Sequence, residues 1–214
     1  MTMLAISVLS AQPAPQTASP GITFRLRIEE LSGARIHSMT LRCQVQISAR
    51  CRRYAKDEQS RLYELFGDVS QWERTLRTVT WSQSTLVVPS FDRRIDIDLS
   101  VPCTYDLQVA AAKYLHAIRD RHVPLTFLFS GMMFRVADGG LRIEPVPWDL
   151  ETTYQMRASI WHASMDQFFP GRGWLMLRRD TIDRLQAFRG QHAVVSWDEA
   201  IDLLLQDLAA EEPA

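Results

Sequence analysis

One thiol of this chain stands where a nucleophile could be activated. Cys103 lies in VPCTYDLQVAAAKYLHAI, residues 101–118, directly before a run with helical periodicity. A thiol at a helix N-terminus can have a lowered pKa, but catalysis also needs a base within hydrogen-bonding reach. His116 stands 13 residues later, which is about 18–20 Å along a helix axis, too far for that role. Nothing in the sequence brings another histidine to Cys103, so the pattern favours a packed thiol at a strand–helix junction.

A second candidate for chemistry is the carboxylate pair Asp149 and Glu151, which follows Trp148 in PVPWDLE. Carboxylates beside an aromatic ring can have raised pKa values and serve in acid–base catalysis. Acidic residues in a turn more often cap or bend the chain, and we favour that interpretation. The sequence contains no C-x2-C or H-x3-H spacing, no glycine-rich phosphate loop and no G-x-S-x-G elbow. We therefore expect no cofactor and no metal.

Tryptophans and arginines indicate a different kind of function. Three of the six tryptophans, Trp148, Trp174 and Trp197, fall at the boundaries of expected elements. One edge of such a ring can be buried while its N–H stays in water. For each ring alone, fastening a helix to a sheet is the simpler role. Together with Arg172 and Arg178, they form a candidate protein-binding surface, because tryptophan and arginine are common anchors of interfaces.

Composition limits the class of protein. The chain is 46% hydrophobic and 23% charged, as is ordinary for globular proteins. A net charge of −1 implies no general attraction to nucleic acid or anionic lipid. No apolar run reaches the roughly 18 residues of a membrane span, and the first residues lack the basic start of a secretory signal. Three cysteines without a framework pattern predict free thiols in a reducing cytoplasm.

The order of the expected elements predicts an α+β fold. Alternating apolar and polar residues predict half-buried strands, and a repeat of three to four residues predicts helices. We expect a mostly antiparallel sheet or sandwich of about eight strands, with three to five helices, mostly C-terminal, packed on it. The expected strands are 4–9, 22–31, 39–49, 77–88, 93–102, 123–136, 141–148 and 173–177. The expected helices are 57–66, 104–118, 158–169, 180–190 and a last one capped by Ser196, with Glu199 reaching back.

Domain boundaries follow from changes in composition. Residues 1–20 are interpreted as a strand followed by a connector rich in Pro, Ala and Ser. Residues 21–208 are interpreted as a single globular domain, and residues 209–214 as an acidic tail.

Several ordered motifs resemble an uncharacterised bacterial domain family of unknown function, over residues 5–208. The motifs are YELFG (63–67), VPCTYDLQVAAAKYLHAI (101–118), VPLTFLFSG (123–131), PVPWD (145–149), FFPGRGWLMLRRDTIDRLQ (168–186) and SWDEAIDLLL (196–205). The resemblance implies a genetic context, since members are frequently encoded beside uptake nickel–iron hydrogenases, notably of the actinobacterial type. It assigns no role to any residue.

Three functions remain open at this point. We expect a non-catalytic accessory or interaction protein, such as an assembly factor or peripheral subunit of a nickel–iron hydrogenase. One alternative is a small enzyme using Cys103 or the pair Asp149 and Glu151. The other is a client-holding chaperone like the export chaperone SecB, by analogy of fold alone. The expected partner is another protein, and a homo-oligomer is open as well.

Overall fold

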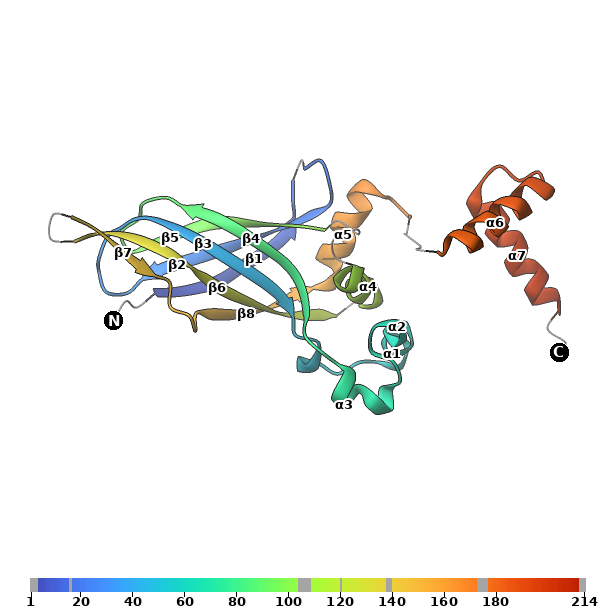
Figure 1. Ribbon diagram of the computed structural model, residues 1–214, viewed down its shortest axis with the longest axis horizontal. Coiled ribbons are helices and arrows are strands. Elements are labelled where there is room, and N and C mark those ends of the chain that lie inside the picture. The colour runs from blue at the N-terminus through green and yellow to red at the C-terminus, as the bar shows by residue number, and fades with distance from the viewer. Residues whose placement is uncertain are drawn as a thin grey trace. The chain divides into compact units, whose positions relative to one another are not determined.

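The computed structural model describes residues 4–15, 17–103, 109–119, 121–137, 140–172 and 177–211. Its contacts divide the chain into two compact units, Met1–Gly171 and Arg172–Ala214, and we describe each by itself (Figure 1). The division expected from the sequence, with one domain over residues 21–208, differs in grouping the last helices with the strands.

The first unit is a sandwich of two antiparallel sheets with helices at one end, so the expected α+β class with about eight strands is confirmed. Sheet A has the strand order β1-β2-β5, and sheet B has the order β4-β3-β6-β7, with β8 also pairing with β6. At the two sides of the sandwich, β8 lies against β1, and β4 lies against β5. The strands are β1 (Leu4–Pro13), β2 (Gly21–Glu30), β3 (Ile36–Ile47), β4 (Val79–Val88), β5 (Arg94–Pro102), β6 (His122–Ala137), β7 (Gly140–Pro145) and β8 (Glu151–Arg157).

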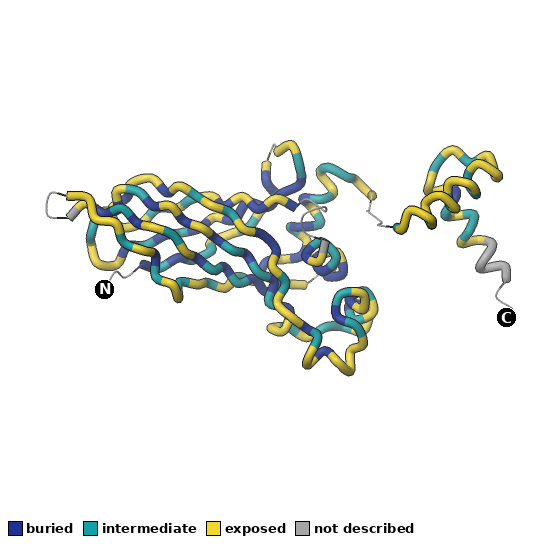
Figure 2. The backbone as a smooth tube through the Cα atoms, in the orientation of Figure 1, coloured by how far each residue is buried: buried dark blue, intermediate teal, exposed yellow. Residues whose placement is uncertain are grey.

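The period-two pattern of the strands decides which side chains face the other sheet, as the alternating colours of Figure 2 show. The inward residues of β2 are fully buried: Phe24, Leu26 and Ile28. On the outward face, Arg25 donates to Asp98 (2.9 Å) and Arg27 to Asp96 (2.8 Å), both on β5. The two aspartates therefore form cross-strand ion pairs on a wet face, the kind of pair that stabilises neighbouring strands.

The centre of the core is aromatic. Phe24 meets Phe127 at 5.1 Å and Trp81 at 6.1 Å between ring centroids, both edge to face. Such pairs contribute about 0.5–1.5 kcal/mol each beyond the burial of their area. Cys43 lies fully buried on the same side of sheet B, as the alternation of apolar and polar residues over 39–49 requires.

Short helices cover one end of the sandwich, away from β7 (Figure 1). The expected helix 57–66 is split in two at Leu62. The expected helix start at 104–108 lies outside the described residues, and so do residues 173–176 of the expected strand 173–177. Tyr54 and Tyr114 share a hydrogen bond of 2.8 Å between their hydroxyls, which ties the loop before α1 to α4. The helices are α1 (Lys56–Arg61), α2 (Tyr63–Phe66), α3 (Trp72–Thr75), α4 (Val109–Ala117) and α5 (Ala158–Phe168), with 3-10 turns η1 (Ala49–Cys51) and η2 (Val69–Gln71).

Strand β1 is longer than expected. It continues to Pro13, which pairs with Ile22, and Ala14 then donates its N–H to Gly21 at 2.8 Å. Much of the Pro/Ala connector therefore belongs to sheet A, because the backbone groups of β2 need partners along their whole length.

The second unit contains the helices α6 (Arg179–Gln191) and α7 (Trp197–Glu211). The predicted capping box is confirmed, because Glu199 N–H donates to Ser196 Oγ at 3.1 Å and Ser196 N–H to the Glu199 carboxylate at 3.5 Å. Helix α6 ends one residue beyond Gly190, and Ala193 supplies the left-handed conformation (φ 53°) after it. Within the described residues, no helix combines the length and apolarity that a membrane crossing requires.

Candidate protein-interaction surface

Sheet B carries exposed apolar side chains at the end away from the helices. We call this set the apolar face. Its members are Met132, Phe134 and Val136 of β6, Leu141 and Ile143 of β7, and Val87 of β4. All but the half-buried Phe134 are exposed, and Ile143 is 58% exposed. Contiguous apolar surface of this kind marks binding sites in monomeric proteins more often than ordinary surface.

The strand register brings these residues together on one side of the sheet. Along β6, Met133 and Arg135 point inward and are buried, so the residues between and beside them point outward. Val136 pairs with Leu141, and Phe134 pairs with Ile143. The sequence of β6 is apolar on both sides, as is typical of a central strand covered on both faces. The structure covers only its inner side here, so the outer side is surface.

Strand β7 forms the free edge of sheet B beside the apolar face. In the described part of the chain it pairs with β6 alone. Val146 N–H donates to Gly131 O at 2.9 Å. Backbone N–H and C=O groups alternate in direction along an antiparallel strand. Glu144 and Arg142, two and four residues before Val146, therefore direct their N–H and C=O groups to β6 as Val146 does. Leu141 and Ile143 consequently direct their N–H and C=O groups away from the sheet.

Trp148 extends into solvent from the connection between β7 and β8. Its side chain is 93% exposed. The connection itself is held in place, because Val146 N–H donates to Gly131 O and Phe129 N–H donates to Leu150 O at 3.0 Å. The backbone beneath the ring is therefore already ordered, so a partner that covers Trp148 would have to order only its side chain, and tryptophan is a common binding anchor.

The other predicted interface residues belong to the second unit. Arg172 is exposed, and Arg178 is exposed with its guanidinium 3.2 Å from Asp180. Trp197 is 41% exposed, and Arg189 stacks over its ring at 4.2 Å. Trp174 lies outside the described residues. The five residues named from the sequence thus fall in two units, and their shared role stays a prediction.

Cys103 has the environment of a core thiol. Its side chain is 5% exposed, and its backbone N–H donates to Pro20 O at 2.8 Å. Burial raises the pKa of the Cys103 thiol to about 12, whereas a nucleophilic cysteine needs a lowered pKa. The same cause raises the pKa of Cys43 to about 12. Cys51 is the exposed one of the three free cysteines.

The carboxylates of Asp149 and Glu151 both lie exposed at the surface. They lack the apolar enclosure by which active sites tune an acid or a base. In the described parts of the chain, no three His, Cys, Asp or Glu side chains gather in a group that could hold a metal ion.

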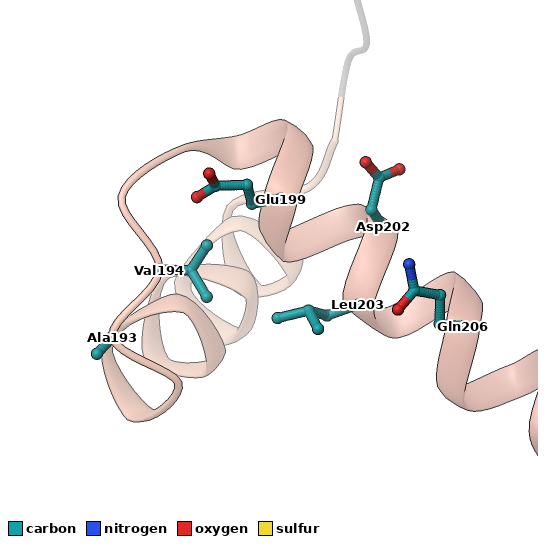
Figure 3. Close-up of a pocket in the computed structure, with 6 residues that line it drawn as sticks. All are labelled: Ala193, Val194, Glu199, Asp202, Leu203 and Gln206. Atoms are coloured by element: carbon teal, nitrogen blue, oxygen red, sulfur yellow. The ribbon is translucent and has the colours of Figure 1, made fainter.

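Two hollows are open to solvent. The first, of about 430 Å³, belongs to the second unit and lies between the loop after α6 and the helix α7 (Figure 3). Its walls include Val194, Leu203 and two carboxylates, Glu199 and Asp202. The Glu199 carboxylate already accepts a hydrogen bond from the N–H of Ser196. The second, of about 300 Å³, lies where Arg121 and Arg157 flank the start of α5. The second hollow is also lined by His122 and Ser159, and no hydrogen bond among the described residues joins these two side chains.

Comparisons with solved structures find only distant likenesses. β-Glucosidase 3B from Thermotoga neapolitana, solved with α-D-glucose, is 7% identical with a TM-score of 0.26, over 72% of this chain and 17% of that one. A β-glucosidase from Kluyveromyces marxianus is 9% identical with a TM-score of 0.22, over 72% of this chain and 15% of that one. The chain spans less than a fifth of either enzyme, and likenesses this weak carry no argument.

No protein of curated function matches the chain in sequence. A model of a family of unknown function, DUF6084, matches residues 1–213. The resemblance to an uncharacterised domain family is thereby confirmed in its coarser part: the chain belongs to the DUF6084 family.

Proposed function

We propose that this protein is a non-catalytic accessory protein that binds another protein through the apolar face and Trp148. The observation that carries the proposal is the group of large apolar side chains left exposed beside a free strand edge. The paired strands hold the backbone of these residues in place, so a partner would have to order only their side chains on binding.

The chemistry of the face suits a protein partner. Met132 is flexible and polarisable, and methionine adapts its shape to different surfaces. Trp148 belongs to the residue types that dominate binding energy in interfaces. Around the centre, Thr40 and Ser38 of β3 pair with Met132 and Phe134, which supplies the polar groups typical of an interface rim.

The partner we propose is a subunit of a nickel–iron hydrogenase, for which this chain would serve as assembly factor or peripheral subunit. Support for this choice comes from the family resemblance and its genetic context. The buried Cys103 and the exposed Asp149 and Glu151 favour this binding role over the enzyme alternative.

The test is co-purification of the tagged chain with hydrogenase subunits expressed together with it. Met132→Ser and Trp148→Ala are expected to reduce the captured subunits by at least tenfold, since interface anchors contribute about 2 kcal/mol or more. Val69→Ser is the matched control, because Val69 is 44% exposed on η2, outside the apolar face. Failure of the wild-type chain to capture either subunit would refute the hydrogenase partner. Capture that both face variants leave intact would refute the surface.

A further inference from the structure

We propose that β7 pairs with β7 of a second copy of this chain, antiparallel across a two-fold axis, so that the two B sheets become one continuous sheet. This inference goes beyond the proposed function, because it concerns self-association and not the accessory partner. It rests on the free edge of β7, on the order of charges along the strand and on the apolar face beside it.

The edge has the donors and acceptors that strand pairing needs. Leu141 and Ile143 direct both backbone groups away from β6, as the bond from Val146 to Gly131 requires. Among the residues that the structure describes, β6 is the one strand that pairs with β7, so the opposite edge of β7 carries no strand. Pro145, which has no N–H, still offers its C=O in the same direction. The other lateral edges of the sandwich differ, since β8 lies against β1 and β4 against β5.

The strand GLRIEP is self-complementary in one register. With Ile143 opposite Ile143 of the partner subunit, the two residues exchange their N–H···O bonds, and Leu141 N–H donates to the C=O of the partner's Pro145. The same register places Arg142 opposite Glu144 of the partner subunit, and Glu144 opposite the partner's Arg142. These form a pair without backbone bonds between them, in which side chains approach most closely.

Neighbouring registers are disfavoured by charge. If the centre of the pairing moves from Ile143 to residue 142, Arg142 lies opposite the partner's Arg142. If it moves to residue 144, Glu144 lies opposite the partner's Glu144. Like charges directly opposite each other destabilise a strand pair. The sequence of β7 therefore specifies one alignment with a second copy, as a register determined by side-chain complementarity requires.

The pairing would also join the two apolar faces. Directly opposed residues in antiparallel strands point to the same side of a sheet. Ile143 and Leu141 of both copies would then lie side by side on the outer surface, next to Met132 and Val136 of each copy. The dimer would present one continuous apolar surface, of which each single chain presents one half.

The short strand limits the affinity. Six residues extend only about 20 Å, and a contact this small belongs to the weak class of interfaces. We expect a dissociation constant of about 1–100 µM. Sedimentation velocity over about 5–500 µM is expected to show a reversible shift from monomer to dimer. A wild-type chain that stays monomeric over this range would overturn the proposal.

Charge reversal tests the register. In the Arg142→Glu variant, residues 142 and 144 are both glutamates, and in Glu144→Arg both are arginines. Like charges then face each other across the dimer, so each single variant is expected to be monomeric. An equimolar mixture of the two is expected to form a heterodimer, and the double variant is expected to dimerise again. A dimer that persists in Arg142→Glu, or a mixture of folded variants that remains monomeric, would contradict the register.

Glu144 also lies 3.7 Å from Arg135 of its own chain, so Glu144→Arg changes a contact within the monomer as well. A second kind of variant leaves this contact unchanged. Ile143→Pro removes only the N–H that points away from β6, a position where proline fits an edge strand. This variant is expected to keep its circular dichroism spectrum and lose the dimer. Val69→Ser, on η2 and outside the apolar face, is the control that should keep the dimer. A monomeric wild-type chain that still captures its partner would overturn the dimer and leave the proposed function standing.

Discussion

Gly131 is the position where a single methyl group should disturb the sandwich most. It lies on β6 opposite Leu41 of β3, just before the segment that pairs with β7. Its φ is +149°, a conformation that residues with a side chain rarely adopt. A Cβ at this position would lie 1.9 Å from Thr40 O, a backbone atom that cannot rotate away. Gly131→Ala therefore forces β6 and β3 apart.

The expected loss of stability has two parts. Backbone strain at such a φ costs about 1–3 kcal/mol, and forcing an extra methyl into a packed site costs about another 1–3 kcal/mol. Gly131→Ala should then lower the free energy of unfolding by about 4 kcal/mol, which corresponds to a fall in Tm of roughly 8–16 °C for a chain of this size.

Gly67→Ala separates the two parts. Gly67 also has a positive φ, +70°, but a Cβ there would meet nothing within 4 Å. It should lose only the strain, about 1–3 kcal/mol. Urea unfolding followed by fluorescence measures both variants, because Trp81 in the sandwich core is 2% exposed. If Gly131→Ala loses no more stability than Gly67→Ala, the close approach of β6 to β3 is wrong.

Three further outcomes are expected. Iodoacetamide at pH 8 should label Cys51 and leave Cys103 unlabelled in the native protein, because a thiol with a pKa of about 12 is about 0.01% thiolate at that pH. Mass spectrometry of tryptic peptides identifies the labelled cysteines. Rapid labelling of Cys103 would support the enzyme alternative. Burial alone would raise the pKa of Glu30, but hydrogen bonds from Ser32 and the charge of Arg135 outweigh burial and lower that pKa. The free energy of unfolding should therefore fall as the pH drops below about 4 toward the folded-state pKa. In thermal unfolding scans, Glu30→Gln should lower stability at pH 7 by about 3 kcal/mol and flatten this acid dependence. Trp148→Ala should change Tm by less than about 2 °C, as surface substitutions do, and a larger fall would show that the ring packs on the sandwich.

Local pattern was sufficient to predict most elements of the fold. The alternation in 22–31 and 39–49 identifies both the strands and the buried side of Cys43, because side-chain direction in a strand follows from sequence position alone. The capping box of Ser196 and Glu199 was predictable for the same reason, since its hydrogen bonds form within one turn. The depth of Cys103 could be predicted because an apolar strand and helix flank it.

The apolar face could not be predicted in this way. Residues 132–136 are as apolar on their outer side as 123–129, and only the tertiary arrangement decides whether a second layer covers them. The alternation of Leu141 and Ile143 with Arg142 and Glu144 was sufficient to predict the strand expected over 141–148. That this strand ends the sheet depends on where β8 pairs, which no local pattern specifies. Trp148 was selected from its place at a boundary, but its near-complete exposure was not predictable from local pattern.

One edge of β6 serves two strands in succession. β8 pairs with His122–Leu128, and β7 pairs with Met132–Ala137. The two ladders can therefore open separately, and loss of the β7 ladder leaves the β8 ladder and the aromatic centre closed. Amide hydrogens along β7 should exchange with solvent through this local opening long before those of β8. The segment that we assign to association is thus able to adjust or detach at little cost in global stability, which allows a reversible assembly without partial unfolding of the sandwich.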